Sequence, residues 1–158
     1  MEDWKTAMRR GILSGGTASV LSTLALAATG KHETGSMFAP TNAISHWFFG
    51  DKATRRDAPS LRYTVTGYLI HHASATFWAV LFERVMGNRL DKKDLPTTLV
   101  ASAAASAVAC FTDSQLTPKR LHPGYEKRLS SPALALVYGA FALGLAAGAI
   151  ANRRGRSG

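Results

Sequence analysis

Four long stretches of the chain are almost free of charge, and they constrain its fold more than any other feature. They cover about residues 11–30, 63–83, 95–113 and 131–152, and formal charge enters them only at a terminal position. Because the hydrocarbon core of a bilayer is roughly 30 Å thick, a helix needs about 20 apolar residues to cross it. The pattern therefore predicts an all-α integral membrane protein, a four-helix bundle forming a single transmembrane domain over residues 1–158.

The connection between the first two stretches has a helical pattern of its own. Residues 41–49 place Ile44, Trp47 and Phe48 on one helical face, and Gly50 follows where a helix would end. So short a segment does not span a bilayer. We expect an additional short interfacial or re-entrant helix here, with its apolar face against the membrane.

Residue types that cap helix N termini stand at the start of three of the four stretches. Ser60 precedes the second, Asp94 the third, and Ser131 begins the fourth. Pro132 follows Ser131 at the first helical position, which proline favours. These residues predict where the helices begin.

The positive charge of the chain lies outside the predicted spans. Lys and Arg number 19 against 10 Asp and Glu, which gives a net charge of +9. Short basic clusters such as Arg9-Arg10 and Arg153-Arg154 are typical of anchors that face anionic lipid headgroups. A nucleic-acid interface would instead show one basic stripe with interleaved aromatic residues, so no nucleic-acid partner is expected.

Orientation follows from the same basic residues. They divide almost equally between the two sides, but both tails place an arginine pair directly against a span, which favours termini in the cytoplasm. The first stretch also has the features of a cleavable secretory signal, with Lys5 before it and Ala25-Leu26-Ala27 near its end. Its length favours a retained span instead.

Small residues at four-residue spacing predict how the helices pack. Gly11 and Gly15 lie on one face of the first span, and Ala140, Gly144 and Gly148 on one face of the fourth. Because lipid is as apolar as leucine, membrane helices associate through close backbone approach at such faces. We expect these faces to pack within the chain; a homodimer is the alternative.

Polar residues inside the second and third spans suggest an internal seam. His71 and His72 are adjacent near mid-membrane, where ionisable residues are costly and usually face a protein interior. His72 shares a helical stripe with Thr76 and Glu83, and the third span carries its own polar stripe. We expect the two stripes to face each other. The candidate seam, with the nearby His46, comprises His46, His71, His72, Thr76, Glu83, Ser102, Ser106 and Asp113.

Three interpretations of this seam remain open. In the first, neutral histidines form hydrogen bonds with hydroxyl groups across helices and serve only the structure. In the second, His72, Glu83 and Asp113 form a proton relay, although both carboxylates lie near helix ends where solvated charges are ordinary. In the third, His46 pairs with His71 or His72 to hold haem or a metal.

Three segments of the chain resemble small uncharacterised inner-membrane proteins of proteobacteria. They are PTNAISHWFFGDKA, LIHHASATFWAVLFERV and TDSQLTPKRLHPGYEKRLS, which begin at Pro40, Leu69 and Thr112. The resemblance implies a multi-pass protein of the bacterial inner membrane with four spans. It transfers no catalytic residue.

The sequence contains no complete catalytic, nucleotide-binding or metal-binding motif, and Cys110 is the single cysteine. We therefore predict no catalytic residue, no metal site and no cofactor. The expected function is that of a non-enzymatic accessory or structural component of a membrane assembly, with a membrane protein or a second copy as partner. The alternative is handling of a proton, a small molecule, haem or a metal through the histidine region.

Overall fold

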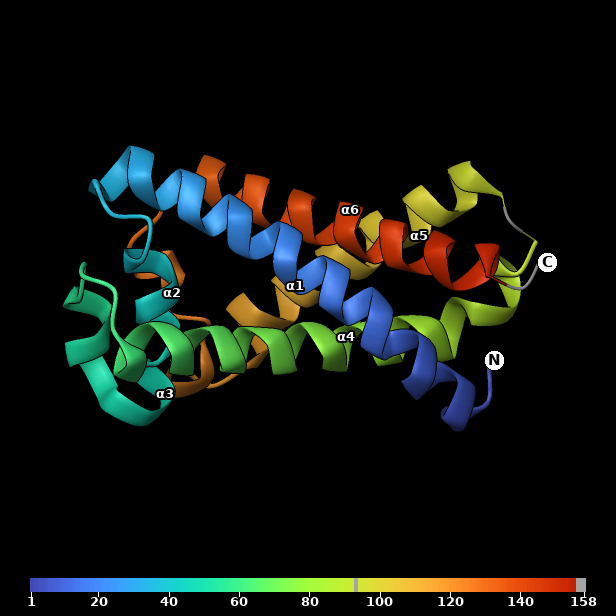
Figure 1. Cartoon of the computed structure of the whole chain (residues 1–158), viewed down its shortest axis with the longest axis horizontal. Helices are drawn as coiled ribbons and strands as arrows, with labels where there is room; N and C mark the ends of the chain where they lie inside the picture. The colour runs from blue at the N-terminus through green and yellow to red at the C-terminus, as the bar shows by residue number, and fades with distance from the viewer. Residues whose placement is uncertain (93, 156–158) are drawn as a thin grey trace.

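Four long helices lie side by side and alternate in direction. The structure is a computed structural model and describes residues 1–92 and 94–155. The helices are α1 (Trp4–Thr34), α4 (Thr66–Leu90), α5 (Leu95–Phe111) and α6 (Ser131–Arg154). The two described ends of the chain lie at the same end of the bundle (Figure 1). The regular structure of the described residues is entirely helical, which confirms the all-α class.

Short helical segments gather at the opposite end of the bundle (Figure 1). Two of them, α2 (Ala39–Ile44) and α3 (His46–Phe49), follow α1. The others are the 3-10 turns η1 (Gly50–Arg55), η4 (Lys119–Leu121) and η5 (Tyr125–Lys127), and the π-helical turns η2 (Leu61–Val65) and η3 (Thr112–Leu116). The turn η2 leads into α4, and η3 continues α5.

The helix expected over residues 41–49 is divided at Ser45 into α2 and α3. The Ser45 backbone N–H donates to the Asn42 carbonyl at 3.0 Å, and its hydroxyl donates to the same oxygen at 2.7 Å, which tightens the turn there. As a result Ile44 is buried whereas Phe48 is 72% exposed. The expectation of one shared apolar face was therefore wrong.

The predicted helix starts agree with the structure at two of three places. The Ser60 hydroxyl accepts from the Tyr63 N–H, and the Asp94 carboxylate accepts from the Thr97 N–H. At α6 the prediction was wrong by one residue, because Ser130 is the cap and accepts from the Ala133 N–H. Ser131 is then the first helical residue and Pro132 the second.

The predicted small faces lie at helix crossings. A Cβ atom on Gly11 would lie 2.4 Å from the Val80 side chain, and one on Gly15 would lie 2.6 Å from the Thr76 Cα, so both glycines let α4 approach α1. Added Cβ atoms on Gly144 and Gly148 would each lie 2.4 Å from a Cα atom of α1. The small face of α1 thus packs on α4, and the α6 glycines pack on a different part of α1, at Ser14 and Ala18, so both faces are used inside the chain.

Ala140 has a different position from these glycines. It lines a groove on the outside of the bundle with Leu136, Gly139 and Leu143, next to Ala103 of α5. Space is open around Gly139, since a Cβ built there meets no atom within 4 Å. Part of the small-residue surface of α6, at Gly139, is therefore not covered by any of the residues that the structure describes.

The distribution of polarity is that of a membrane protein. Serine, threonine and ion-paired side chains fill much of the interior, including Ser14, Ser19, Ser22, Ser102 and Ser106. Large apolar side chains project outward from all four long helices, among them Ile12, Leu24, Leu69, Phe77, Val100 and Leu136. Water would disfavour so large an apolar exterior, whereas lipid accepts it.

Over the described residues, three helices are long and apolar enough to cross a membrane. They are Trp4–Thr34, Leu95–Leu116 and Ser131–Arg154. The helix α4 has the length but not the apolarity, because His71, His72, Glu83 and Arg84 fall within it. Four spans were expected, and α4 is the one that is absent from this set.

Candidate functional site

An interior cavity of about 350 Å³ is the main candidate site. It lies among α1, α4, α5 and α6 and extends to the segment that leads into α6. Apolar and aromatic side chains form most of its lining, including Trp47, Trp78, Val137 and Phe141. Its polar groups come from residues far apart in sequence: Ser22, His71, Ser74, Asp113, Tyr125 and Tyr138.

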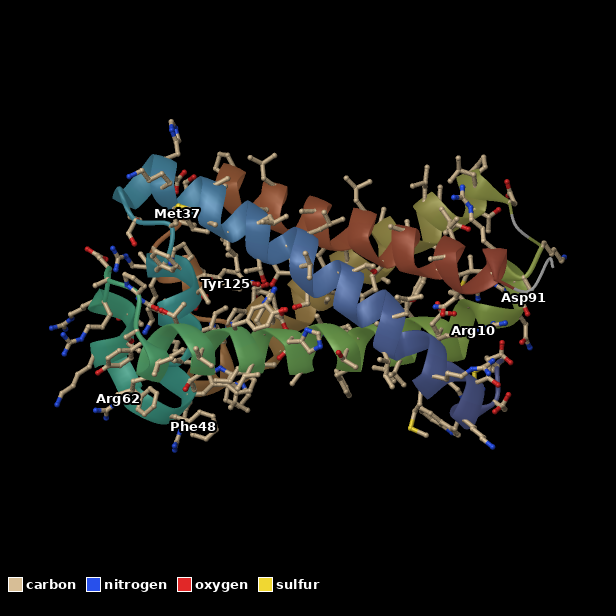
Figure 2. All side chains as sticks on the ribbon, viewed as in Figure 1. Arg10, Met37, Phe48, Arg62, Asp91 and Tyr125 are labelled. Carbon is tan, nitrogen blue, oxygen red and sulfur yellow. The ribbon has the colours of Figure 1, made fainter. Side chains whose placement is uncertain are left out.

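Two tyrosines and an aspartate form a hydrogen-bonded chain along this cavity. The Tyr125 hydroxyl donates to the Tyr138 hydroxyl at 3.1 Å, and Tyr138 donates to Asp113 Oδ2 at 2.8 Å. Tyr125 is buried inside the bundle (Figure 2), and this burial raises the pKa of its phenol far above the ordinary value of 10. The phenol of Tyr125 thus stays protonated and acts as the donor that begins the chain.

His71 is anchored to α1 at the edge of the same cavity. Its Nε2 lies 2.7 Å from the Ser22 hydroxyl oxygen, and that hydroxyl donates to the Ala18 carbonyl at 2.7 Å. Ser22 and His71 thus share one hydrogen bond between α1 and α4, and the tautomer of the imidazole decides which of them donates. The His71 ring also meets the Tyr125 ring edge to face, with 6.4 Å between centroids.

His72 faces a different side of α4 from His71. Among the described residues, neither its buried Nδ1 nor the buried hydroxyl of Thr76 has a hydrogen-bond partner, and the His72 ring lies 5.8 Å from that of Tyr68. This stripe faces α1, since Gly15 packs on Thr76. The glycines of α1 allow a closer approach than α5 does, so the expected facing of the α4 and α5 stripes was wrong.

The polar stripe of α5 turns toward α6 instead. The Ser106 hydroxyl donates to the Tyr138 carbonyl at 2.7 Å, and Ser102 is buried nearby along the same helix. At its end, Asp113 reaches Tyr138 of α6. The polar stripes of α4 and α5 therefore lie at two different interfaces, and of the eight predicted seam residues His71 and Asp113 line the same cavity.

Glu83 belongs to a buried ion cluster at the end of the bundle where the termini lie. It is fully buried. Arg153 Nη2 lies 2.9 Å from Glu83 Oε2, and the Ser14 hydroxyl donates to Glu83 Oε1 at 2.9 Å. This carboxylate is buried at low cost because α6 brings an arginine to the same depth.

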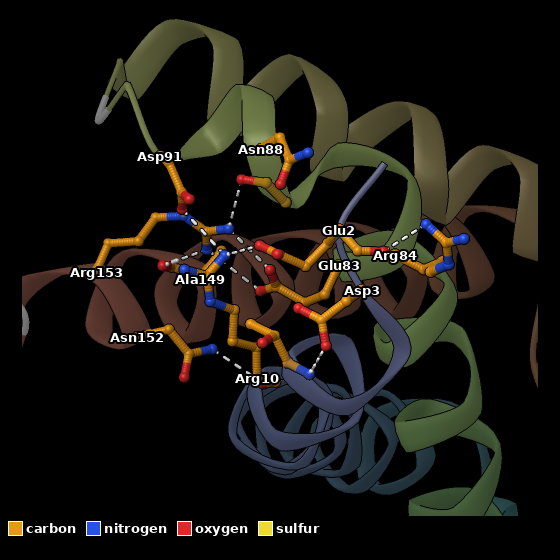
Figure 3. Close-up of polar contacts among 12 residues, drawn as sticks. Glu2, Asp3, Arg10, Glu83, Arg84, Asn88, Asp91, Ala149, Asn152 and Arg153 are labelled. Carbon is orange, nitrogen blue, oxygen red and sulfur yellow. Dashed lines mark hydrogen bonds and ion pairs between the residues drawn. The ribbon is translucent and has the colours of Figure 1, made fainter.

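Arg10 completes the cluster (Figure 3). Its Nη1 lies 2.6 Å from Glu2 Oε2 and 3.0 Å from Asp91 Oδ1, and Asp91 also receives Arg153 Nε at 3.1 Å. Asn152 donates to the Arg10 carbonyl at 2.9 Å. Arg10 and Arg153 were predicted as exposed membrane anchors, and this was wrong, since only their neighbours Arg9 and Arg154 are exposed.

His46 is held apart from the other two histidines. Its Nε2 lies 2.7 Å from the His122 carbonyl, which also accepts from Trp47 Nε1 at 2.9 Å. This ties α3 to the segment before α6. Within the described residues, His, Cys, Asp and Glu side chains do not gather in groups of three that would hold a metal ion.

Five residues that contribute to these sites were not among the predicted site residues: Tyr125, Tyr138, Ser22, Arg10 and Arg153. One signal was present: a carboxylate at Glu83, at the end of an apolar stretch, requires a cation at the same depth if it is buried there. The partnership of Tyr125 with Tyr138 leaves no mark in either helical pattern, because it depends on how η5 folds back over the bundle.

Comparisons with family models, with curated proteins and with solved structures found no match to this chain. The resemblance to small proteobacterial inner-membrane proteins stays a prediction.

Proposed function

We infer that the chain is a four-span protein of the bacterial inner membrane that serves as a non-enzymatic accessory or structural component of a membrane assembly. The observation that carries this is the combination of an apolar exterior on all four long helices with polar and ion-paired side chains inside. Such an arrangement suits a bundle surrounded by lipid.

The direction of the chain supports a fourth span. The helices α1 and α5 run the same way along the bundle (Figure 1), so the chain must return between them, and α4 is the segment that does so. Its charged residue Glu83 is neutralised by Arg153 within the bundle, which removes most of the cost of placing it in a membrane. Exposed apolar residues such as Leu69 and Phe77 face outward from α4.

An accessory role draws support from the outer groove beside α6. Its lining is mostly alanine, glycine and leucine from α1, α5 and α6, with open space at Gly139. A helix of another membrane protein, or of a second copy, packs well against such a surface because the backbones can approach closely.

Cysteine mapping tests the topology directly. In a Cys110→Ala background, Lys5→Cys, Lys52→Cys, Lys92→Cys and Lys127→Cys are labelled with a membrane-impermeant maleimide in intact cells and in inverted vesicles. Four spans with cytoplasmic termini put positions 5 and 92 on the cytoplasmic side and positions 52 and 127 on the other. If α4 did not cross, positions 52 and 92 would be labelled from the same side.

A second candidate function is binding of a small molecule in the interior cavity. The specific observation in its favour is that His71 and Asp113 line one cavity although they come from different helices. A proton relay through Glu83 draws no such support, since Glu83 pairs with Arg153 in the cluster at the opposite end of the bundle from the cavity-lining α2–α3 region. A haem between His46 and His71 is likewise not favoured, because their Nε2 atoms bind His122 and Ser22.

A further inference from the structure

We propose that the interior cavity and the groove between α4 and α5 together hold one neutral single-chain lipid with a hydroxyl head group, such as a fatty or isoprenoid alcohol from the bilayer. The inference rests on the proposed four-span architecture, because the groove must face lipid for such a molecule to enter. It names the ligand class for the second candidate function.

The cavity and the groove are neighbours, since Trp78 lines both and Ala109 of the cavity follows Val108 of the groove along α5. The groove measures about 780 Å³ and is lined almost entirely by apolar side chains, including Leu81, Val85, Val100 and Val108. It extends along α5 from Val108 to Pro96, which at 1.5 Å per residue is about 18 Å. That length suits one extended hydrocarbon chain.

The cavity supplies the polar end of the site. Asp113 and Ser74 contribute acceptor oxygens, and the Asp113 carboxyl receives one hydrogen bond from Tyr138. Among the described lining residues there is no lysine or arginine. An anionic head group would meet the Asp113 carboxyl without a compensating cation, whereas a hydroxyl can donate to it. The site therefore favours an alcohol over a fatty acid or a phospholipid.

The direction of the site matches that of a lipid in its leaflet. Asp113 lies in η3, which joins α5 to the segments at the end of the bundle opposite the termini. The groove runs from there toward the N-terminal end of α5. A bound alcohol thus has its head group toward one membrane surface and its chain toward the bilayer interior.

Tryptophan quenching tests the proposal. The full chain carrying Trp4→Phe, in phospholipid nanodiscs, keeps Trp47 and Trp78, which both line the cavity. Addition of 9,10-dibromooctadecanol should quench their fluorescence in a saturable way, at one alcohol per chain. Quenching that rises linearly without saturation, as for random contact in the bilayer, would overturn the proposal.

Matched variants locate the binding. Ala104 lines the groove and is exposed. Ala104→Phe should therefore raise the alcohol concentration that gives half-maximal quenching by about tenfold or more, which corresponds to a loss of at least about 1.4 kcal/mol of binding free energy. Val100→Trp is a second obstruction of the groove, for use if Ala104→Phe does not fold. Val100→Phe replaces it where the added indole complicates the fluorescence signal. Ala107 is exposed on the same helix, outside the groove lining, so Ala107→Phe should leave quenching unchanged. Equal loss in the Ala104 and Ala107 variants would contradict a site in this groove.

Head-group selectivity is tested with 9,10-dibromostearic acid. The acid should give no saturable quenching of the Trp4→Phe protein but should gain it when Asp113→Asn is added. Equal saturation by acid and alcohol in the absence of that change would overturn the assignment of a hydroxyl head. Cysteine mapping separates the two levels: correct mapping without saturable binding refutes the lipid site alone, whereas wrong mapping refutes the four-span proposal.

Discussion

Glu83 of α4 and Arg153 of α6 form an ion pair inside the bundle, with 2.9 Å between Oε2 and Nη2. The side chain of Glu83 is 0% exposed and that of Arg153 is 5% exposed. Arg153 also donates to the Gly87 carbonyl at 3.0 Å, and Ser14 of α1 donates to Glu83. Three long helices are therefore joined at one buried carboxylate.

Glu83→Gln should destabilise the protein strongly. The change removes the buried countercharge of Arg153 and leaves the guanidinium only Asp91, which is 41% exposed. Removal of one partner from a buried pair typically costs about 3–5 kcal/mol, and Asp91 offsets part of that cost. The loss is measured as a lower midpoint of thermal unfolding in detergent. The double variant Glu83→Gln with Arg153→Gln should recover part of it.

The surface pair of Lys127 with Asp51 is the control for this experiment. The two side chains are 48% and 78% exposed at an N–O distance of 3.4 Å, so Lys127→Ala should cost about 0–1 kcal/mol. A Glu83→Gln protein as stable as the Lys127→Ala protein would contradict the structural role of the buried pair.

Much of the fold is predictable from the sequence because it depends on local pattern. Apolar runs place the four long helices, Ser60 and Asp94 mark two helix starts, and glycines four apart mark the crossing of α1 with α6. Each of these signals is contained within one helix. The division at Ser45 was missed because it depends on a single side-chain bond within the turn.

The candidate site is less predictable because it depends on which helix faces which. The stripes of His72 and Ser106 were each correctly placed on a helix face, but helical periodicity does not choose the neighbour of that face. The neighbouring helix is determined by how closely the backbones can approach. Because Gly15 has no side chain, Thr76 lies close to it, and the α4 stripe packs on α1. Arg10 and Arg153 were wrongly predicted to face lipid headgroups for a related reason. The position of an arginine at the end of a span does not show whether a carboxylate inside the bundle is its partner.

Gly144→Leu should impair folding of the single chain. A Cβ added at Gly144 would lie 2.4 Å from the Ala18 Cα. A leucine there would force α6 away from α1 and lower the free energy of unfolding by about 1–3 kcal/mol or more. Thermal unfolding in detergent, with size-exclusion chromatography coupled to light scattering, measures both stability and oligomeric state.

Gly139→Leu is the matched control on the same helix, because open space surrounds that position. It should leave the stability of the chain nearly unchanged and weaken any association that uses the outer groove. Loss of a dimer in Gly144→Leu at unchanged thermal stability would reverse the assignment of the two glycines.

Acidification should loosen the start of α1. The Asp3 carboxylate accepts a hydrogen bond from the Thr6 N–H at 3.0 Å. Hydrogen bonds from the backbone and side chain of Thr6 lower the pKa of this carboxyl below its ordinary value of 3.8. Because the folded pKa is the lower one, the cap contributes fully above pH 3.8 and is lost as pH falls through the folded pKa. Faster exchange of the Thr6 amide at pH 3 than the intrinsic pH dependence predicts would show this, and Asp3→Asn should lack the effect.

His71→Ala should lower stability by about 0.6–2 kcal/mol, since it removes one interhelical hydrogen bond to Ser22. His32→Ala, at an exposed position near the end of α1, should change stability by less than about 0.5 kcal/mol. An accessory protein tolerates His71→Ala in the cell as long as the bundle still folds. The comparison uses a strain that lacks the gene and shows a growth defect that the unchanged protein corrects. If the His71→Ala protein accumulates, inserts and unfolds at nearly its normal temperature but does not restore growth, the result favours a cavity in which the imidazole contacts a ligand. The two roles proposed for the bundle therefore separate on this one side chain, because it is the residue that both anchors α4 to α1 and lines the cavity.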